Sequence, residues 1–222
     1  GIIQWLFHTG IEASEAMPIL LFIGIGAMID FGPLLTNPLM FLFGAGAQFG
    51  IFAAILLAAA LGFDLKDAVS IGIIGAADGP TSLLVSQVLG SRYIGAIAVA
   101  AYSYMALVPV IQPPIMKLLT TKAERQIVMK ELRPVSRKEK IAFPFVVTIF
   151  VSLLVPSAAP LVGSLMLGNL LKECGVCDRL SKTVQNELMN IVTIFLGISV
   201  GATATAATFL SLDTIKIIVM GV

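Results

Sequence analysis

Charged residues are scarce in this sequence. Only 12% of the 222 residues are Asp, Glu, Lys or Arg, 58% are hydrophobic, and the mean hydropathy is +1.00. An average soluble domain has about 25% charged residues, so the polar surface needed to cover a soluble globule is lacking. The sequence therefore predicts an integral membrane protein of the all-α class. A formal net charge of +1, with no recognisable nucleic-acid-binding module, gives no reason to expect a nucleic-acid partner.

Cysteine and histidine are also rare. The two cysteines, Cys174 and Cys177, stand in the order CGVC, with no second pair to complete a zinc site and no strand-turn-helix context for redox chemistry. The one histidine, His8, lies near Trp5, a composition typical of an interfacial anchor. These scarcities argue against a metal centre built from cysteine and histidine.

Basic residues are present but concentrated in one segment. Eight of the fourteen lie in KLLTTKAERQIVMKELRPVSRKEK, residues 117–140, beside three acidic residues. A short basic loop between apolar spans is typically cytoplasmic, so we predict a basic cytoplasmic loop here. A solvated helical hairpin without topological meaning is the alternative.

Apolar runs of about the length that crosses a bilayer occupy most of the chain. We expect one polytopic membrane domain over residues 1–222, with residues 64–67 (DLKD) as a polar connector. The sequence begins with Gly and stops within an apolar run, so we expect a fragment of a longer chain. The expected spans are residues 17–35, 39–63, 68–89, 93–119, 141–155, 158–171, 188–202 and 209–222.

The stretch GAADGPTS, residues 75–82, interrupts one of the most apolar runs. Pro80 cannot continue a helix from the preceding turn, and Gly75 and Gly79 permit unusual backbone angles. We predict a break around Asp78 between an incoming half-helix, residues 68–75, and an outgoing one that begins near Thr81. Interrupted spans of this kind are the best pointer in a sequence to a transporter site.

Hard oxygen donors gather at this break. The Asp78 carboxylate, the Thr81 and Ser82 hydroxyls and the carbonyls freed by the break suit a small hard cation such as sodium. A carboxylate at the middle of a span costs about 2.5–3.5 kcal/mol on insertion scales and indicates a functional site. A turn at the membrane edge, with Asp78 in water, is the alternative reading.

Other polar residues lie within apolar runs. Tyr104 lies about eleven residues into its expected span, too deep for an interfacial belt, which favours a bonded role inside the protein. Asn169 is a candidate residue lining the sodium site. Asp30 is either a second intramembrane carboxylate or a cap before the turn signal FGP.

Several motifs together carry a family resemblance. The segments are GIIGAADGPTSLL, AIAVAAYSYMALVPVIQPPIMKLLTTKAER, LRPVSRKEKIAFP and GNLLKECGVCDRL. The chain resembles, over essentially its whole length, the β subunit of the sodium-translocating biotin-dependent decarboxylases. That family includes the oxaloacetate, methylmalonyl-CoA, glutaconyl-CoA and malonate decarboxylase pumps.

The resemblance implies a fold with broken transmembrane helices in an inverted repeat. It also implies a membrane subunit that decarboxylates carboxybiotin and exports sodium. Asp78 matches the family's intramembrane aspartate, which binds sodium and a proton, and Tyr104 matches a tyrosine near the same site. The family's first membrane segment and the second half of its ion site have no counterpart in this sequence.

The implied partners are a biotin carrier or carboxyltransferase subunit, a small membrane γ subunit, further copies of the same chain, and the lipid of a bacterial or archaeal cytoplasmic membrane. The implied cofactors are sodium and carboxybiotin presented by a partner rather than bound covalently. From the residues alone, a sodium- or proton-coupled secondary transporter without a catalytic step explains Asp78 equally well. An inert membrane scaffold does not.

Overall fold

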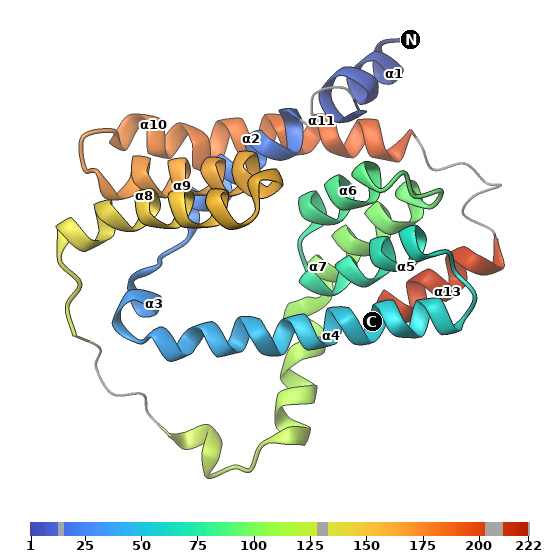
Figure 1. Cartoon of the computed structure of the whole chain (residues 1–222), viewed down its shortest axis with the longest axis horizontal. Helices are drawn as coiled ribbons and strands as arrows, with labels where there is room; N and C mark the ends of the chain where they lie inside the picture. Colours follow the sequence, from blue (N-terminus) through green and yellow to red (C-terminus); the bar gives the residue numbers. More distant parts are fainter. Residues whose placement is uncertain (13–15, 128–132, 203–210, 222) are drawn as a thin grey trace. The chain divides into compact units, whose positions relative to one another are not determined.

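All regular structure in the described residues is helical. The computed structural model describes residues 1–12, 16–127, 133–202 and 211–221 (Figure 1). The predicted all-α class is therefore confirmed. The chain forms two compact units, one of Gly1–Phe41 with Arg133–Ala202 and one of Leu42–Leu132 with Thr203–Val222. The expectation of one membrane domain stays a prediction.

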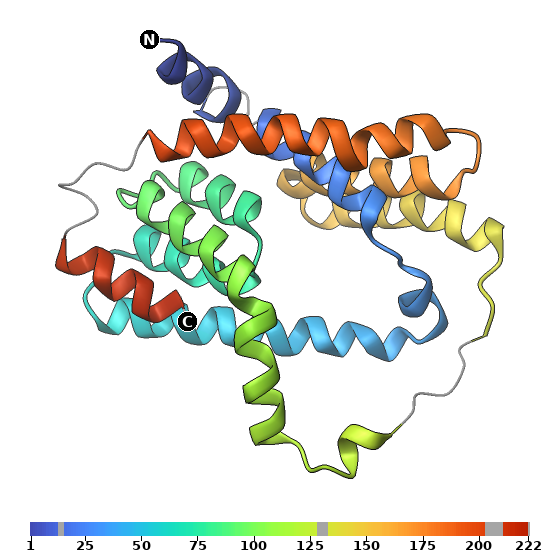
Figure 2. The ribbon, with the colours of Figure 1, turned by 180° about the vertical axis from the view of Figure 1, so that it is seen from behind.

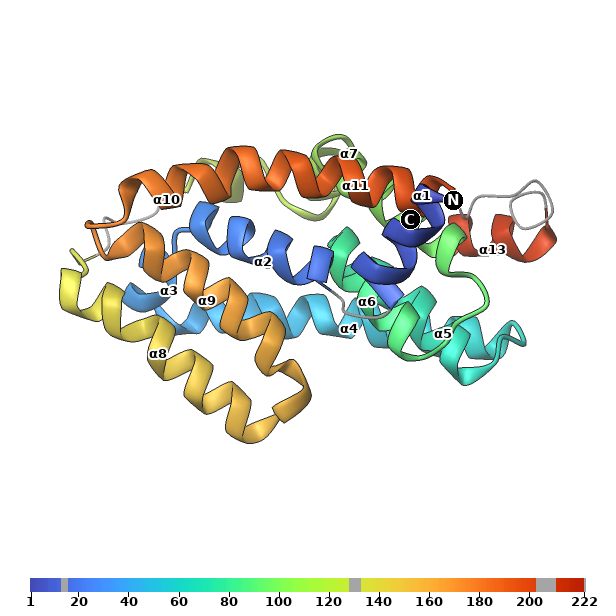
Figure 3. The same cartoon turned by 90° about the horizontal axis from the view of Figure 1, so that it is seen from above.

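The first unit is built mainly from α2, α8, α9 and α11. Two of them, α8 and α9, run side by side as a hairpin (Figure 3). Its helices are α1 (Ile2–Phe7), a π-helical turn (His8–Glu12), α2 (Ala16–Met28), α3 (Gly32–Thr36), α8 (Arg137–Leu154), α9 (Ala159–Glu173), α10 (Asp178–Thr183), a π-helical turn (Val184–Leu188) and α11 (Met189–Gly201).

Glycines let α2 and α9 pack closely. A Cβ atom at Gly26 would meet the backbone oxygen of Leu165, and one at Gly168 would meet the backbone oxygen of Ile23. Small residues at such a contact allow two helix backbones to approach, which is the usual way in which helices associate in lipid. Gly26 and Gly168 are therefore needed for this packing.

Two boundaries in this unit follow from local chemistry. The expected span over residues 17–35 ends as a helix at Met28, and Asp30 then accepts a hydrogen bond from the Gly32 backbone N–H at 2.9 Å. Asp30 is thus the cap at a turn, one of the two predicted alternatives. The expected separation of the spans over residues 141–155 and 158–171 is confirmed, because α8 ends at Leu154 and α9 begins at Ala159.

The second unit contains the predicted break. It consists of α4 (Phe41–Ala60), α5 (Leu65–Gly72), a 3₁₀ turn (Ile73–Ala76), α6 (Gly79–Val88), α7 (Ile94–Leu119), a 3₁₀ turn (Glu124–Gln126) and α13 (Leu212–Gly221). The α6 helix lies beside the first half of α7 (Figure 2). Of the basic segment, residues 128–132 lie outside the described residues.

Among the residues that the structure describes, one helical segment is long and apolar enough to cross a membrane. It covers Pro38–Ala60, which is a 3₁₀ turn followed by α4, and only 6% of its most apolar window is buried. Within the described residues, the shorter apolar helices cover Ala16–Met28, Ile94–Tyr104 and Val110–Leu119. Length and composition are the only grounds for this assignment.

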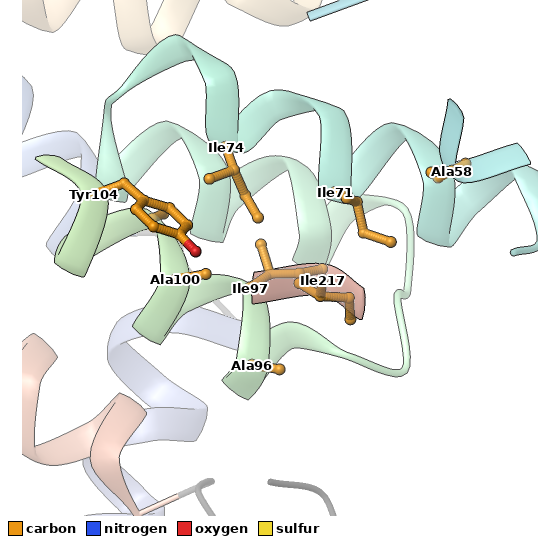
Figure 4. Close-up of a cluster of buried hydrophobic side chains, with 10 residues drawn as sticks. Ala58, Ile71, Ile74, Ala96, Ile97, Ala100, Tyr104 and Ile217 are labelled. Atoms are coloured by element: carbon orange, nitrogen blue, oxygen red, sulfur yellow. The ribbon is translucent and has the colours of Figure 1, made fainter. Parts of the chain in front are cut away.

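The core of the second unit lies where α5, α7 and α13 meet. Ile71, Ile97 and Ile217 are buried together at its centre (Figure 4). Alanines from α7 let the neighbouring helices come close, and Tyr104 closes one end of the cluster. This core fixes α7, and with it the tyrosines of that helix, against the broken segment.

Candidate functional site

The chain breaks its helix at Ala77 and Asp78. Ala77 has φ 52° and ψ 35°, the left-handed conformation that residues with a Cβ rarely adopt, and Asp78 is extended with φ −131° and ψ 104°. The segment from Ala68 to Leu89 is therefore not one helix. The predicted break between two half-helices is confirmed.

One detail of the prediction was wrong, and one feature of the break was not predicted. The outgoing helix α6 begins at Gly79 rather than near Thr81, because proline fits the first turn of a helix, where no N–H partner is needed. The left-handed residue is Ala77 and not Gly75 or Gly79. Gly79 serves a different purpose: a Cβ atom there would lie 2.6 Å from Cε1 of Tyr102.

Hydroxyl groups surround Asp78. The Thr81 Oγ1 hydroxyl donates to the Asp78 carboxylate oxygen Oδ2 at 2.5 Å. The Ser82 hydroxyl donates to the backbone oxygen of Asp78 at 2.8 Å and, more weakly, to that of Ile73 at 3.4 Å. The structure thus brings Asp78, Thr81 and Ser82 together, with Thr81 on the carboxylate and Ser82 tying the two half-helices through their backbones.

The Tyr104 hydroxyl points toward α13 and not toward the Asp78 carboxylate. It donates to the backbone oxygen of Ile218 in α13. The Tyr104 side chain also lines a cavity of about 290 Å³ with Gly75, Ala77 and Gln112 among the other lining residues. The structure brings Tyr104 beside the break but bonds its hydroxyl to α13. A role at the ion site stays a prediction.

Asn169 lies in the first unit. It is buried in α9, and its side-chain amide donates to the backbone oxygen of Ile29 at 3.4 Å. The Lys172 amine donates to the same oxygen at 3.1 Å. Both bonds hold the end of α2 to α9, and a place for Asn169 at the sodium site stays a prediction.

The cysteines form no metal centre with other residues that the structure describes. No group of three or more His, Cys, Asp or Glu side chains is placed to hold a metal within the described ranges. Cys174 and Cys177 are both free thiols. A backbone hydrogen bond from Val176 lowers the pKa of Cys174, whereas the hydrogen bond with Cys174 raises the pKa of Cys177.

Comparison with known proteins identifies the family. The family model described as "Na+-transporting oxaloacetate decarboxylase beta subunit" matches residues 1–222. The chain belongs to this family. The methylmalonyl-CoA decarboxylase subunit beta of Veillonella parvula is 59% identical over 97% of the chain and 58% of its own length.

Other β subunits are similarly close. The glutaconyl-CoA decarboxylase subunit beta of Acidaminococcus fermentans is 57% identical over 100% of the chain and 58% of its own length. The oxaloacetate decarboxylase beta chain of Klebsiella pneumoniae is 56% identical over 100% of the chain and 52% of its own length. The chain therefore spans little more than half the length of the β subunits that it matches.

The burial of one carboxylate, that of Asp67, was not predicted from the sequence. Asp67 was expected in a polar connector, yet it is 2% exposed. It accepts hydrogen bonds from the Ser91 hydroxyl at 2.8 Å, from the Arg92 backbone N–H at 3.1 Å and from the Arg92 guanidinium at 3.1 and 3.3 Å. The hydrogen bond to Asp67 raises the pKa of Arg92. This clamp joins the start of α5 to the loop between α6 and α7.

Tyr102 was not among the predicted site residues, although it stands two residues from Tyr104. Successive residues of a helix are about 100° apart, so residues two apart face different directions. Tyr104 faces α13, whereas the Tyr102 ring packs on Gly79 at the start of α6. The spacing alone shows that the two side chains point in different directions. Only the packing of α6 against α7 shows that Tyr102 is the one next to Gly79, the residue after Asp78.

Proposed function

We propose that this chain is part of the membrane subunit of a sodium pump. The subunit couples decarboxylation of carboxybiotin, carried by a partner protein, to sodium export. Membership of the Na+-transporting decarboxylase β family supports the pump and the decarboxylation. The single structural observation that carries the assignment is the Asp78 carboxylate at the break between two half-helices, with the Thr81 hydroxyl on it at 2.5 Å.

Asp78 binds sodium and a proton in turn. Low-dielectric surroundings favour the neutral carboxyl group, and a bound cation favours the carboxylate. Each ligand therefore displaces the other. Sodium occupies the site from the cytoplasmic side and leaves outward when a proton replaces it, and that proton is consumed when carboxybiotin loses CO2. Thr81 and Ser82 supply neutral oxygen ligands in this scheme.

Tyr104 assists the coupled step from beside the break. Its support is the family correspondence together with its position on the cavity that Gly75 and Ala77 also line. The bond from its hydroxyl to Ile218 makes it a link between α7 and α13. A motion of α13 would therefore be transmitted through Tyr104 to the break at Asp78.

The partners follow from the same assignment. A biotin carrier or carboxyltransferase subunit presents carboxybiotin, a small membrane γ subunit completes the complex, and several copies of the chain assemble in the cytoplasmic membrane as multi-pass proteins. The basic segment over residues 117–140 faces the cytoplasm, where its positive charge suits an approaching carboxybiotin carrier.

Sodium-dependent decarboxylation of free carboxybiotin is the decisive experiment. The full-length protein is reconstituted in liposomes, and CO2 release is measured in matched sodium and potassium chloride. We expect release that depends on sodium and is accompanied by uptake of radioactive sodium. A secondary transporter without a catalytic step would move sodium and release no CO2, and that result would overturn the proposal.

A further inference from the structure

The Tyr102 hydroxyl is a buried polar group without a hydrogen-bond partner among the residues that the structure describes. Its oxygen has almost no solvent-accessible surface. Buried hydroxyl groups are nearly always hydrogen-bonded, because an unmet one loses its water without compensation. An unmet group therefore calls for an explanation, and an ion or water that occupies the position in the working protein is the usual one.

The position of the ring indicates which ligand this is. A Cβ atom at Gly79 would lie 2.6 Å from Cε1, 2.7 Å from Cζ and 2.8 Å from Cδ1 of Tyr102. Cζ is the carbon that carries the hydroxyl, so that edge of the ring rests on the residue that follows Asp78.

The other hydroxyl groups nearby already have partners. Thr81 donates to the Asp78 carboxylate, and Ser82 donates to backbone oxygens on both sides of the break. Tyr104, the other deep tyrosine of α7, donates to Ile218. Tyr102 thus combines a buried, unmet oxygen with a ring that packs on Gly79, the residue that follows Asp78.

We propose that the Tyr102 hydroxyl oxygen is a ligand of the sodium ion held at Asp78. This rests on the proposed function and extends it by one residue from a third element of the site. The role requires Gly79, since any side chain there would push the ring from α6. A neutral oxygen helps to satisfy a hard cation such as sodium without adding a second negative charge.

Replacement of Tyr102 by Phe tests the proposal in the full-length protein. Sodium that binds only the folded state stabilises it by mass action, so the thermal midpoint is measured over a range of sodium chloride at constant ionic strength. For Tyr102→Phe we expect about a tenfold higher half-saturating sodium concentration, as for the loss of one hydrogen-bonding group. In sodium-free buffer we expect an unchanged or higher midpoint, because no protein contact is lost.

Tyr93→Phe, at the N-cap of the same helix, is the matched control. The Tyr93 hydroxyl donates to the Asp213 carboxylate at 2.9 Å, so its removal breaks a protein contact. We expect a lower midpoint without sodium and an unchanged half-saturating concentration. Tyr102→Phe should therefore change the half-saturating sodium concentration without lowering the sodium-free midpoint, and Tyr93→Phe should do the reverse.

Two results would overturn the assignment of Tyr102. One is a wild-type half-saturating sodium concentration in Tyr102→Phe, and the other is a lowered sodium-free midpoint with the sodium response intact, which would indicate a structural hydroxyl. Asp78→Asn separates this proposal from the proposed function. If it abolishes the sodium response while Tyr102→Phe leaves it intact, only the Tyr102 proposal fails; if Asp78→Asn keeps the response, the sodium site itself is wrong.

Discussion

Single hydroxyl and methyl groups around Asp78 determine how a cation would be held there. Thr81→Val keeps the size of the side chain and removes the hydroxyl that donates to the carboxylate. A hydrogen bond to a charged group contributes about 1.5–3 kcal/mol, so we expect the half-saturating sodium concentration for decarboxylation to rise by about tenfold to a hundredfold. Thr148→Val is the control, because its hydroxyl bonds only the Pro144 backbone oxygen in α8. Equal sodium dependence in both variants would contradict this role for Thr81.

Gly79 and Gly75 provide a second comparison at this scale. A Cβ atom at Gly79 would overlap the Tyr102 ring, whereas one at Gly75 would lie 3.5 Å from Cγ1 of Ile51, an ordinary contact. We expect Gly79→Ala to lose most sodium-stimulated decarboxylation and Gly75→Ala to retain it, with membrane levels of both variants measured on blots. Full activity of Gly79→Ala would show that the close approach of Tyr102 is unnecessary.

Residue types were partly predictable from the sequence here. DGP in an apolar run predicts a break, because proline ends a helix, and a functional carboxylate at it, because an aspartate is too costly in lipid to be incidental. The sequence could not indicate that Ala77 takes the left-handed conformation. It also could not separate Tyr102 from Tyr104, since that depends on which helix each face of α7 meets.

The clamp at Asp67 fixes how α5, α6 and α7 are joined. The Asp67 side chain is buried and Arg92 is 74% exposed, so the ion pair itself adds little and the hydrogen bonds that Asp67 accepts matter more. We expect Asp67→Asn to lower the free energy of unfolding by about 2 kcal/mol, measured as a lower thermal midpoint in detergent. Asp64→Asn is the control, because Asp64 is exposed and makes no side-chain cap bond. Equal thermal midpoints for Asp67→Asn and Asp64→Asn would argue against the clamp.

The start of α8 depends on an ionised carboxylate. Hydrogen bonds from Arg133 and Ser136 lower the pKa of Glu139 from 4.5 to about 2. A lowered pKa means that the stabilisation is complete above pH 4.5 and is lost progressively as pH falls from 4.5 to about 2. We expect hydrogen-exchange protection of the first turn of α8, corrected for intrinsic rates, to be the same at pH 7 and about pH 5.5 and to fall progressively below pH 4.5. Loss of protection with a midpoint near 4.5 would contradict the capping box.

Helix boundaries followed the sequence where a local signal was strong. Pro156 separates α8 from α9, and Asp30 caps a turn before Gly32-Pro33. The burial of Asp67 was not foreseen, because it arises from Ser91 and Arg92, more than twenty residues away. Contacts of that kind depend on the tertiary fold and leave no local pattern.

For the whole molecule, the basic segment sets the expected orientation in the membrane. Eight of the fourteen basic residues lie in residues 117–140, which predicts a cytoplasmic position. A cysteine introduced at exposed Lys122, in a background without Cys174 and Cys177, should react with an impermeant maleimide in inverted vesicles and not in intact cells. Labelling from the outside of intact cells alone would reverse the topology.

The proposed sodium pump depends on the Asp78 carboxylate. The most direct measurement is sodium-stimulated decarboxylation together with sodium uptake by full-length Asp78→Asn in proteoliposomes. This variant keeps the size of the side chain and removes the charge. We predict that both activities are abolished, and that Asp78→Glu, which moves the charge by about one methylene, leaves little or none. Normal sodium-stimulated decarboxylation by Asp78→Asn would contradict the account.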